Sequence, residues 1–225
     1  MDETILISDF SRNPLKTGIL RSSVGYLYGT CARRLYYACR DNVIDVPPKE
    51  VFQNGIDKHK EIQRSKYPEM EHESYRERAI PMINGVNRVG VTYDNIDSSR
   101  IVEIKPRYSF KGNSMPAYVQ TLIERFVSPS LPIFIYSYRD DQEFQIKADY
   151  EKSRIYIARI LTAIKQIPPK IPNADRMKRP CSECAFQEEC WNSDSEGTKE
   201  EWIEWTRIFV QPNYDHLKGL QDELS

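Results

Sequence analysis

Apolar residues near the start of the chain recur at intervals of three and four positions, a spacing typical of amphipathic helices. The residues with this spacing are Val24, Leu27, Cys31 and Leu35. We therefore expect a helix over residues 22–39 with Cys31 on its apolar face. Pro47 and Pro48 introduce a second predicted helix, over about residues 50–63, in which His59 points inward.

Between Tyr75 and Lys105 the pattern changes to β-branched residues that alternate with polar ones. Three strands are predicted there, at residues 79–83, 89–94 and 101–105, and the turn residues between them favour an antiparallel meander. Further along, the pattern predicts helices and strands that alternate: a helix at 114–126, strands at 133–138 and 143–148, and a helix at 150–167. This order indicates an α/β fold in which helices flank a mixed central sheet.

The C-terminal part begins with a proline-rich linker and ends with a further predicted helix. Thr198 and Glu201 form a capping-box pattern, and Trp202, Trp205 and Phe209 lie at helical spacing behind it. We expect one domain over residues 1–225, made of a first-cysteine helix (22–40), a core (50–167), a linker with a cysteine segment (168–195), and a terminal helix and tail (196–225).

Charge and composition narrow the functional classes. The formal net charge is −1 with 29% charged residues, so the protein as a whole does not attract nucleic acid. Any binding of nucleic acid must come from local clusters of basic residues. The N-terminus is acidic and has only a short apolar run, so we expect no membrane span, no signal peptide and a cytoplasmic protein.

Four of the five cysteines form a candidate metal site. Cys181, Cys184 and Cys190 lie within ten residues, and Cys31 lies far upstream. In a reducing compartment such thiols stay free to bind metal, whereas outside it they would form disulfides. The spacing alone fits a tetrahedral zinc ion or an iron–sulfur cluster. Cys39 is the remaining cysteine, and we assign it to packing.

Acidic residues on two neighbouring predicted strands form a second candidate site. Glu103 and Lys105 flank Ile104 and so share one strand face, and a hairpin would place Asp94 beside Glu103. Carboxylate oxygens suit Mg²⁺ or Mn²⁺, a lysine can orient an attacking water, and His59 could complete the ligand set. Taken singly, these patterns also fit a solvated strand face and a packed histidine.

The order of these residues resembles the CRISPR-associated exonucleases of the Cas-four family, RecB-like members of the PD-(D/E)xK nuclease superfamily. The motifs that carry the resemblance are Cys31-Ala32-Arg33-Arg34-Leu35-Tyr36-Tyr37, Gly55-Ile56-Asp57-Lys58-His59, the strand from Gly90 to Asp94, Glu103-Ile104-Lys105, and the three C-terminal cysteines. The resemblance covers residues 22–191.

The resemblance implies a restriction-endonuclease-like core with the cysteine segment closed onto the N-terminal helix. It implies that Cys31, Cys181, Cys184 and Cys190 hold an iron–sulfur cluster, usually 4Fe-4S. It implies that His59, Asp94, Glu103 and the Ile104 carbonyl bind Mn²⁺ or Mg²⁺, and that Lys105 assists the nucleophile. The expected activity is exonucleolytic trimming of single-stranded DNA or prespacer overhangs, in partnership with the CRISPR integrase.

The chain departs from the family's pattern on the helix after the catalytic strand. That helix usually carries a glutamine followed four residues later by a tyrosine, whereas here Gln120 is followed at that distance by Glu124. Gln120 is expected to contact substrate or water. Tyr118 is the nearest tyrosine, and both Tyr118 and Gln120 also fit an ordinary helix surface.

Basic and aromatic residues near the two sites could grip a single strand of DNA. They are Arg33, Arg34, Arg40, Lys105, Arg107, Lys111, Arg176, Lys178 and Arg179, together with Tyr36, Tyr37 and Tyr108. Two other functions stay open. One is a non-catalytic iron–sulfur adaptor that binds DNA and the integrase. The other is a viral or recombination-repair nuclease with the same chemistry, since motifs report the reaction and not the pathway.

Overall fold

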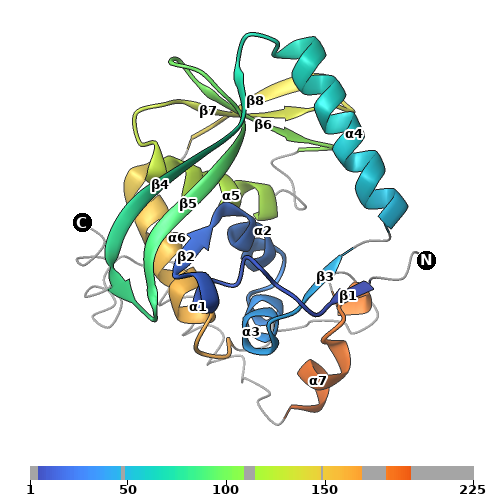
Figure 1. Cartoon of the computed structure of the whole chain (residues 1–225), viewed down its shortest axis with the longest axis vertical. Helices are drawn as coiled ribbons and strands as arrows, with labels where there is room; N and C mark the ends of the chain where they lie inside the picture. The colour runs from blue at the N-terminus through green and yellow to red at the C-terminus, as the bar shows by residue number, and fades with distance from the viewer. Residues whose placement is uncertain (1–4, 47–48, 109–114, 148, 169–180, 194–225) are drawn as a thin grey trace.

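The protein is an α/β structure built around one mixed sheet (Figure 1). The computed structural model describes residues 5–46, 49–108, 115–147, 149–168 and 181–193. Within these ranges the main sheet has six strands. They are β2 (Ile19–Arg21), β4 (Glu71–Ile83), β5 (Val86–Ile96), β6 (Ile101–Lys105), β7 (Ile133–Ser137) and β8 (Gln142–Ile146).

The sheet is mixed because β2 runs parallel to β5 and β6 runs parallel to β7, whereas the β4–β5, β5–β6 and β7–β8 pairs are antiparallel. The predicted meander of β4, β5 and β6 is therefore confirmed. Strand β4 begins at Glu71, eight residues before the predicted start at 79. Its first half has a largely polar sequence, so the pattern of apolar residues did not reveal it. A separate two-stranded sheet pairs β1 (Ile5–Ile7) with β3 (Ile44–Val46).

Seven helices and one 3-10 turn are described around these strands. They are α1 (Pro14–Thr17), α2 (Ser22–Thr30), α3 (Ala32–Asp41), α4 (Lys49–Lys66), α5 (Met115–Val127), α6 (Tyr150–Ala163), η1 (Cys181–Glu183) and α7 (Gln187–Asn192). Figure 1 shows α4 beside β6–β8, away from α5 and α6, which lie together behind the β4–β5 ribbon. The mixed α/β architecture with helices flanking a mixed sheet is the predicted fold class.

Two apolar clusters fix the helices against the sheet. The larger one joins α2, α5 and α6 to the central strands and is centred on side chains such as Leu122, Ile123 and Phe126, which are fully buried. The smaller one packs Ile62 of α4 against Val102 and Ile104 of β6. Helix α4 is thereby held over β6, which determines where His59 lies.

The single helix predicted over residues 22–39 is wrong, because the chain breaks into α2 and α3 at Cys31. Cys31 has extended backbone angles, φ −166° and ψ 121°, and ends one helix while it begins the next. Gly29 and Thr30 precede the break, and both have low helix propensity. The apolar spacing continues across the break, which is why the pattern alone suggested one helix.

The remaining helices follow the pattern with shifted ends. Helix α5 matches the predicted 114–126 within a residue, α6 ends at Ala163 rather than 167, and α4 runs three residues beyond the predicted end at 63. The predicted terminal helix with Trp202, Trp205 and Phe209, and most of the linker, lie outside the described residues. No helix among the described residues has the length and apolar composition to cross a membrane.

Candidate functional site

The first candidate site lies where β5 and β6 separate below α4. The ladder between these strands contains the pairs Asn95–Val102 and Ile96–Ile101. At the next position the Asp94 N–H donates to the Glu103 side chain, with 3.4 Å between N and Oε1. The two carboxylates therefore meet at the point where the strands diverge, as the predicted hairpin required.

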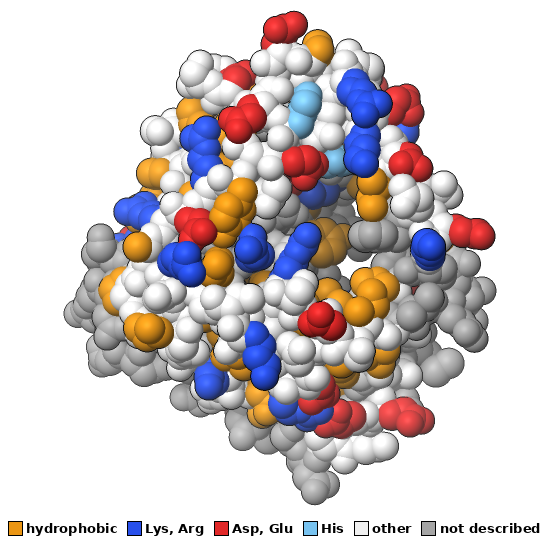
Figure 2. Space-filling model, viewed as in Figure 1, with side chains coloured by type: hydrophobic (Ala, Val, Ile, Leu, Met, Phe, Trp, Pro, Cys, Tyr) orange, Lys and Arg blue, Asp and Glu red, His pale blue; other side chains and the backbone are white. Residues whose placement is uncertain are grey.

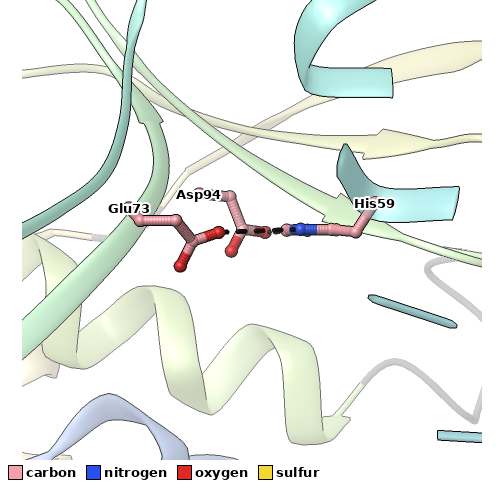
Figure 3. A group of neighbouring side chains, drawn as sticks. All are labelled: His59, Glu73 and Asp94. Atoms are coloured by element: carbon pink, nitrogen blue, oxygen red, sulfur yellow. Dashed lines mark hydrogen bonds and ion pairs between the residues drawn. The ribbon is translucent and has the colours of Figure 1, made fainter. Parts of the chain in front are cut away.

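His59 reaches this point from α4 (Figure 3). Its Nε2 lies 2.9 Å from Asp94 Oδ2. The same Asp94 oxygen accepts a hydrogen bond from the Ile104 N–H at 2.7 Å. Burial alone would raise the pKa of Asp94, but Lys105 and His59 outweigh it and hold the pKa below its usual value. Asp94 is therefore a carboxylate in the metal-free protein.

Lys105 and Gln120 both bind Glu103. The Lys105 Nζ and the Gln120 Nε2 lie 2.9 Å and 2.7 Å from Glu103 Oε2. Glu103 is fully buried, and this burial together with the neighbouring Asp94 raises its pKa to about 7. Burial alone would lower the pKa of Lys105, but Glu103 and Asp94 reverse that effect and raise it. Lys105 is thus a cation under all ordinary conditions.

The site residues predicted from sequence are thus brought together. His59, Asp94, Glu103, Lys105 and Gln120 form one chain of hydrogen bonds. Ile104 joins it through its backbone N–H. Tyr118 lies on α5 as well, but the ammonium of Lys152 covers its ring at 4.9 Å, away from these contacts.

Glu124 is a third carboxyl at this site, one helical turn beyond Gln120 on α5. It is fully buried and lies against the Glu103 carboxyl, with which it can share a hydrogen bond only in its protonated form. Burial and the nearby Glu103 raise its pKa well above the usual value. The residue at which the chain departs from the family's glutamine–tyrosine pattern is therefore packed beneath the candidate site, and not on the helix surface.

Glu73 and Gln63 also belong to this site, and the sequence patterns missed both. Glu73 on β4 has an oxygen 3.8 Å from His59 Nδ1. Together His59, Glu73 and Asp94 could hold a metal ion, because one ligand atom from each lies within 4.8 Å of the other two. Gln63 donates to the Glu73 side chain at 3.0 Å and to the Asp94 carbonyl at 2.8 Å. The only sequence signal was the spacing of Gln63, one turn after His59.

The four predicted cluster cysteines line one cavity of about 30 Å³. Cys31 enters it from the break between α2 and α3, Cys181 and Cys184 from η1 and the residue after it, and Cys190 from α7. Arg33, Arg34, Tyr37, Phe186, Gln187 and Trp191 complete the lining. We call this arrangement the cysteine cage. Cys39 is 2% exposed and packs in the main core, in keeping with its assignment to packing.

Ordinary contacts hold the cysteine segment against α3 and β3. The rings of Tyr37 and Phe186 stack at 5.8 Å, and the Ala185 N–H lies 3.4 Å from an Asp45 oxygen. Arg40 forms an ion pair with Glu189 at 2.5 Å. Burial raises the pKa of Cys31, and it raises the pKa of Cys184 to about 11, so a bound metal would have to displace protons from these thiols.

The basic and aromatic residues proposed to contact DNA are largely engaged within the protein. Arg34 pairs with Asp45 at 2.5 Å, and Arg40 pairs with Asp41 and Glu189. Tyr37 and Tyr108 are 1% and 4% exposed, so they are not available to stack on bases. Arg107 is exposed after β6, and Lys111, Arg176, Lys178 and Arg179 lie outside the described residues. Figure 2 shows basic and acidic side chains intermixed over the visible face.

Comparisons with known proteins bear on the fold. No family model matches the chain, and none of the curated proteins matches it. A solved structure described as the crystal structure of SSO0001 is similar, with a TM-score of 0.50 and 17% sequence identity over 77% of this chain and 86% of that chain. At this identity the likeness extends to the fold alone. It agrees with a mixed α/β class in which helices flank a mixed central sheet.

Proposed function

We propose that the chain is a metal-dependent nuclease of the RecB-like PD-(D/E)xK type. The observation that carries the proposal is the meeting of His59, Asp94, Glu103 and Lys105 at the point where β5 and β6 diverge. Asp94 and Glu103 come from the two strands of one hairpin, and His59 comes from a helix 35 residues before Asp94. A structural ion pair needs only two opposite charges, whereas four carboxyls, an imidazole and an ammonium are gathered here.

An imidazole nitrogen and carboxylate oxygens are donor types that suit a small divalent cation. Without an ion, His59 Nε2 and Asp94 Oδ2 share a hydrogen bond of 2.9 Å, which a bound cation would replace. With Glu103 and the Ile104 carbonyl they make up the proposed ligand set for Mn²⁺ or Mg²⁺. Such an ion would supply Lewis acidity and positive charge to a phosphodiester.

The side chains around this set have distinct roles in the proposed hydrolysis. Lys105 keeps its proton because two carboxylates raise its pKa, so it orients water and stabilises negative charge on the phosphate rather than acting as a base. Gln120 fixes one oxygen of Glu103 and leaves its own carbonyl oxygen to face water or substrate.

The proposed substrate is single-stranded DNA or a DNA overhang, and the proposed reaction is trimming from an end, as in the processing of prespacers for the CRISPR integrase. The support is the order of motifs along the chain, and the restriction-endonuclease-like core is part of the same proposal. Because Arg34 and Arg40 are paired and Tyr37 and Tyr108 are buried, binding would depend on exposed groups such as Arg107.

The cysteine cage supports an iron–sulfur cluster, with 4Fe-4S as the proposed type. The four thiols line one cavity, and four thiolates suit either a tetrahedral zinc ion or an iron–sulfur cluster. The resemblance to the Cas-four family favours the cluster.

The test uses the full chain with its cluster intact and DNA labelled at either end. With Mn²⁺ present we expect single strands to be shortened stepwise, and we expect Glu103→Gln and Lys105→Ala each to slow cleavage by about 10²–10⁴-fold. Glu77→Gln is the matched control, because Glu77 lies on β4 and pairs with the exposed Arg88 at 3.1 Å. Uncut DNA, or Glu103→Gln protein that cuts as fast as the wild type, would refute the proposal.

A second candidate function is a non-catalytic adaptor that binds DNA and the integrase through the cluster segment. The observation that favours it is Glu124, which stands on α5 where the resembled nucleases carry a tyrosine. DNA binding without metal-dependent cleavage would support this role. Co-purification with an integrase would favour the CRISPR pathway over a viral or repair nuclease, whichever role holds.

A further inference from the structure

Glu73 faces the candidate site from the strand opposite Asp94. Its neighbours pair regularly with β5, His72 with Asn95 and Ser74 with Tyr93. Glu73 itself is left out of this register and has φ 52°, in the left-handed region that few residues other than glycine occupy. The irregularity occurs beside Asp94 and aims the Glu73 carboxylate at the ring of His59 (Figure 3).

The two ring nitrogens of His59 have different neighbours. Nε2 lies 2.9 Å from Asp94 Oδ2, on the side of the proposed ion, whereas Nδ1 lies 3.8 Å from Glu73 Oε1. No other side chain in the described ranges forms an ion pair with Nδ1. Each ring nitrogen thus has a different carboxylate as its nearest charged neighbour, and the two carboxylates approach within 4.8 Å of each other.

Gln63 holds the Glu73 carboxylate in this place. It is 4% exposed, and its Nε2 donates both to Glu73 Oε1 at 3.0 Å and to the Asp94 carbonyl at 2.8 Å. Gln63 lies one turn after His59 on α4, so one helix carries both the imidazole and the amide that fixes its carboxylate partner. The Glu73 side chain is 60% exposed, and the bond from the buried Gln63 is the contact that holds its carboxylate near His59.

We propose that Glu73 is a positioning residue that accepts the Nδ1 proton of His59 in a hydrogen bond and so presents Nε2, unprotonated, to the divalent cation. The proposal rests on the metal site of the proposed function. Histidines that bind metals commonly donate their second ring N–H to a carboxylate, which fixes the tautomer and the ring orientation. In that arrangement Asp94 and the imidazole bind the ion together, and Glu73 acts on the ion only through the ring.

The test measures Mn²⁺ affinity by calorimetry and the His59 tautomer by ¹⁵N NMR with Mg²⁺ bound. We expect Glu73→Ala to weaken Mn²⁺ binding by about 10–100-fold, and Glu73→Gln, which keeps an acceptor oxygen, to recover part of that loss. The Mg²⁺-bound wild type should show the Nδ1–H tautomer, and Glu73→Ala should show a mixture. Glu77→Ala, on the same strand, should match the wild type in both measurements.

The outcomes separate this inference from the proposed function. Loss of Mn²⁺ binding in Asp94→Asn with unchanged binding and tautomer in Glu73→Ala would overturn the role of Glu73 alone. Unchanged binding in Asp94→Asn would overturn the metal site, and the inference with it. A Glu73→Gln variant as impaired as Glu73→Ala would mean that the carboxylate binds the ion directly, which also contradicts a positioning role.

Discussion

Three carboxyls around one lysine, two of them fully buried, set the electrostatics of the candidate site at the residue scale. Asp94 is held ionised by Lys105 and His59, whereas Glu103 and Glu124 are pushed toward their neutral forms by burial and by like charge. A divalent cation would relieve this repulsion. Without a cation, the carboxyls of the candidate site therefore repel one another, which is common in sites that bind cations.

Binding of Mn²⁺ should become tighter as the pH rises toward 7. The pKa of Glu103 is raised to about 7, so below that pH its carboxyl is mostly protonated and the ion must displace the proton. His59 also has a raised pKa, because its bond to Asp94 outweighs the effect of burial, and it adds in the same direction. We expect about a tenfold loss of affinity for each pH unit below 7 for one displaced proton.

Calorimetric titration with Mn²⁺ between pH 5.5 and 8.5 measures this dependence. Asp97, whose carboxyl is at the surface, provides the control: Asp97→Asn should leave the profile unchanged. Affinity that stays constant across this range would contradict the buried protonated form of Glu103.

Replacement of Glu124 by methionine should stabilise the metal-free protein. The carboxyl is fully buried beside the Glu103 carboxyl, and an apolar side chain of similar volume removes both its desolvation cost and its contact with a like group. We expect the free energy of unfolding to rise by about 1–3 kcal/mol in urea denaturation. A lower free energy of unfolding would mean that the Glu124 carboxyl makes a stabilising hydrogen bond. The control is Glu77→Met, at an exposed position, which should change stability by less than about 0.5 kcal/mol.

At the scale of elements, the pair of helices α2 and α5 connects the cysteine cage to the candidate metal site. Helix α2 ends at Cys31, and α5 carries Gln120 and Glu124. The helices approach closely because two glycines of α2 face α5. A Cβ on Gly25 would lie 2.3 Å from the Ile123 side chain, and one on Gly29 would lie 2.6 Å from the Pro116 backbone.

Two glycine substitutions should therefore have opposite effects. Gly29→Ala forces the helices apart against rigid backbone, and we expect a loss of about 1–3 kcal/mol. Gly55→Ala on α4 meets no atom within 4 Å and removes a helix-weakening glycine, so we expect a gain of about 0.5–1 kcal/mol. Thermal unfolding of the two variants gives the comparison, and equal effects of the same sign would contradict the close approach of α2 and α5.

At the scale of the whole molecule, the cysteine cage joins a segment near the C-terminus to the N-terminal helices across the intervening α/β core. Contacts that need no metal hold the same segment: the pairs Arg40–Glu189, Tyr37–Phe186 and Arg33–Ser193. We therefore expect the core to fold without the cluster and the cysteine segment to dock more weakly.

Removal of one cage thiolate tests this division. Cys184→Ser should bleach the visible absorbance of anaerobically purified protein and speed proteolysis near residues 181–193, while the core resists the protease. Cys39→Ala should keep the colour, because Cys39 lies in the main core and not in the cage. Colourless wild-type protein with one zinc ion per chain would show that the cage binds zinc and not an iron–sulfur cluster.

Sequence patterns predicted the main elements and much of the candidate site, for reasons visible in particular residues. Glu103 and Lys105 follow from strand alternation, and Asp94 follows from the short turn at Asp97 that folds β5 onto β6. The strands β1, β2 and β3 have three residues each, too few for a detectable period. Glu73 depends on a left-handed backbone, and the break at Cys31 depends on local conformation that apolar spacing does not record.

The break at Cys31 has a consequence for how damage would spread. Helix α2 terminates at this thiol, and its other face rests on the helix that supplies Gln120. Under the proposed function, loss of the sulfur ligands would remove one anchor at the end of α2. A shift of α2 would pass to α5 through their close contact and alter the bond from Gln120 to Glu103, so oxidation at the cysteine cage would lower the proposed activity from a distance.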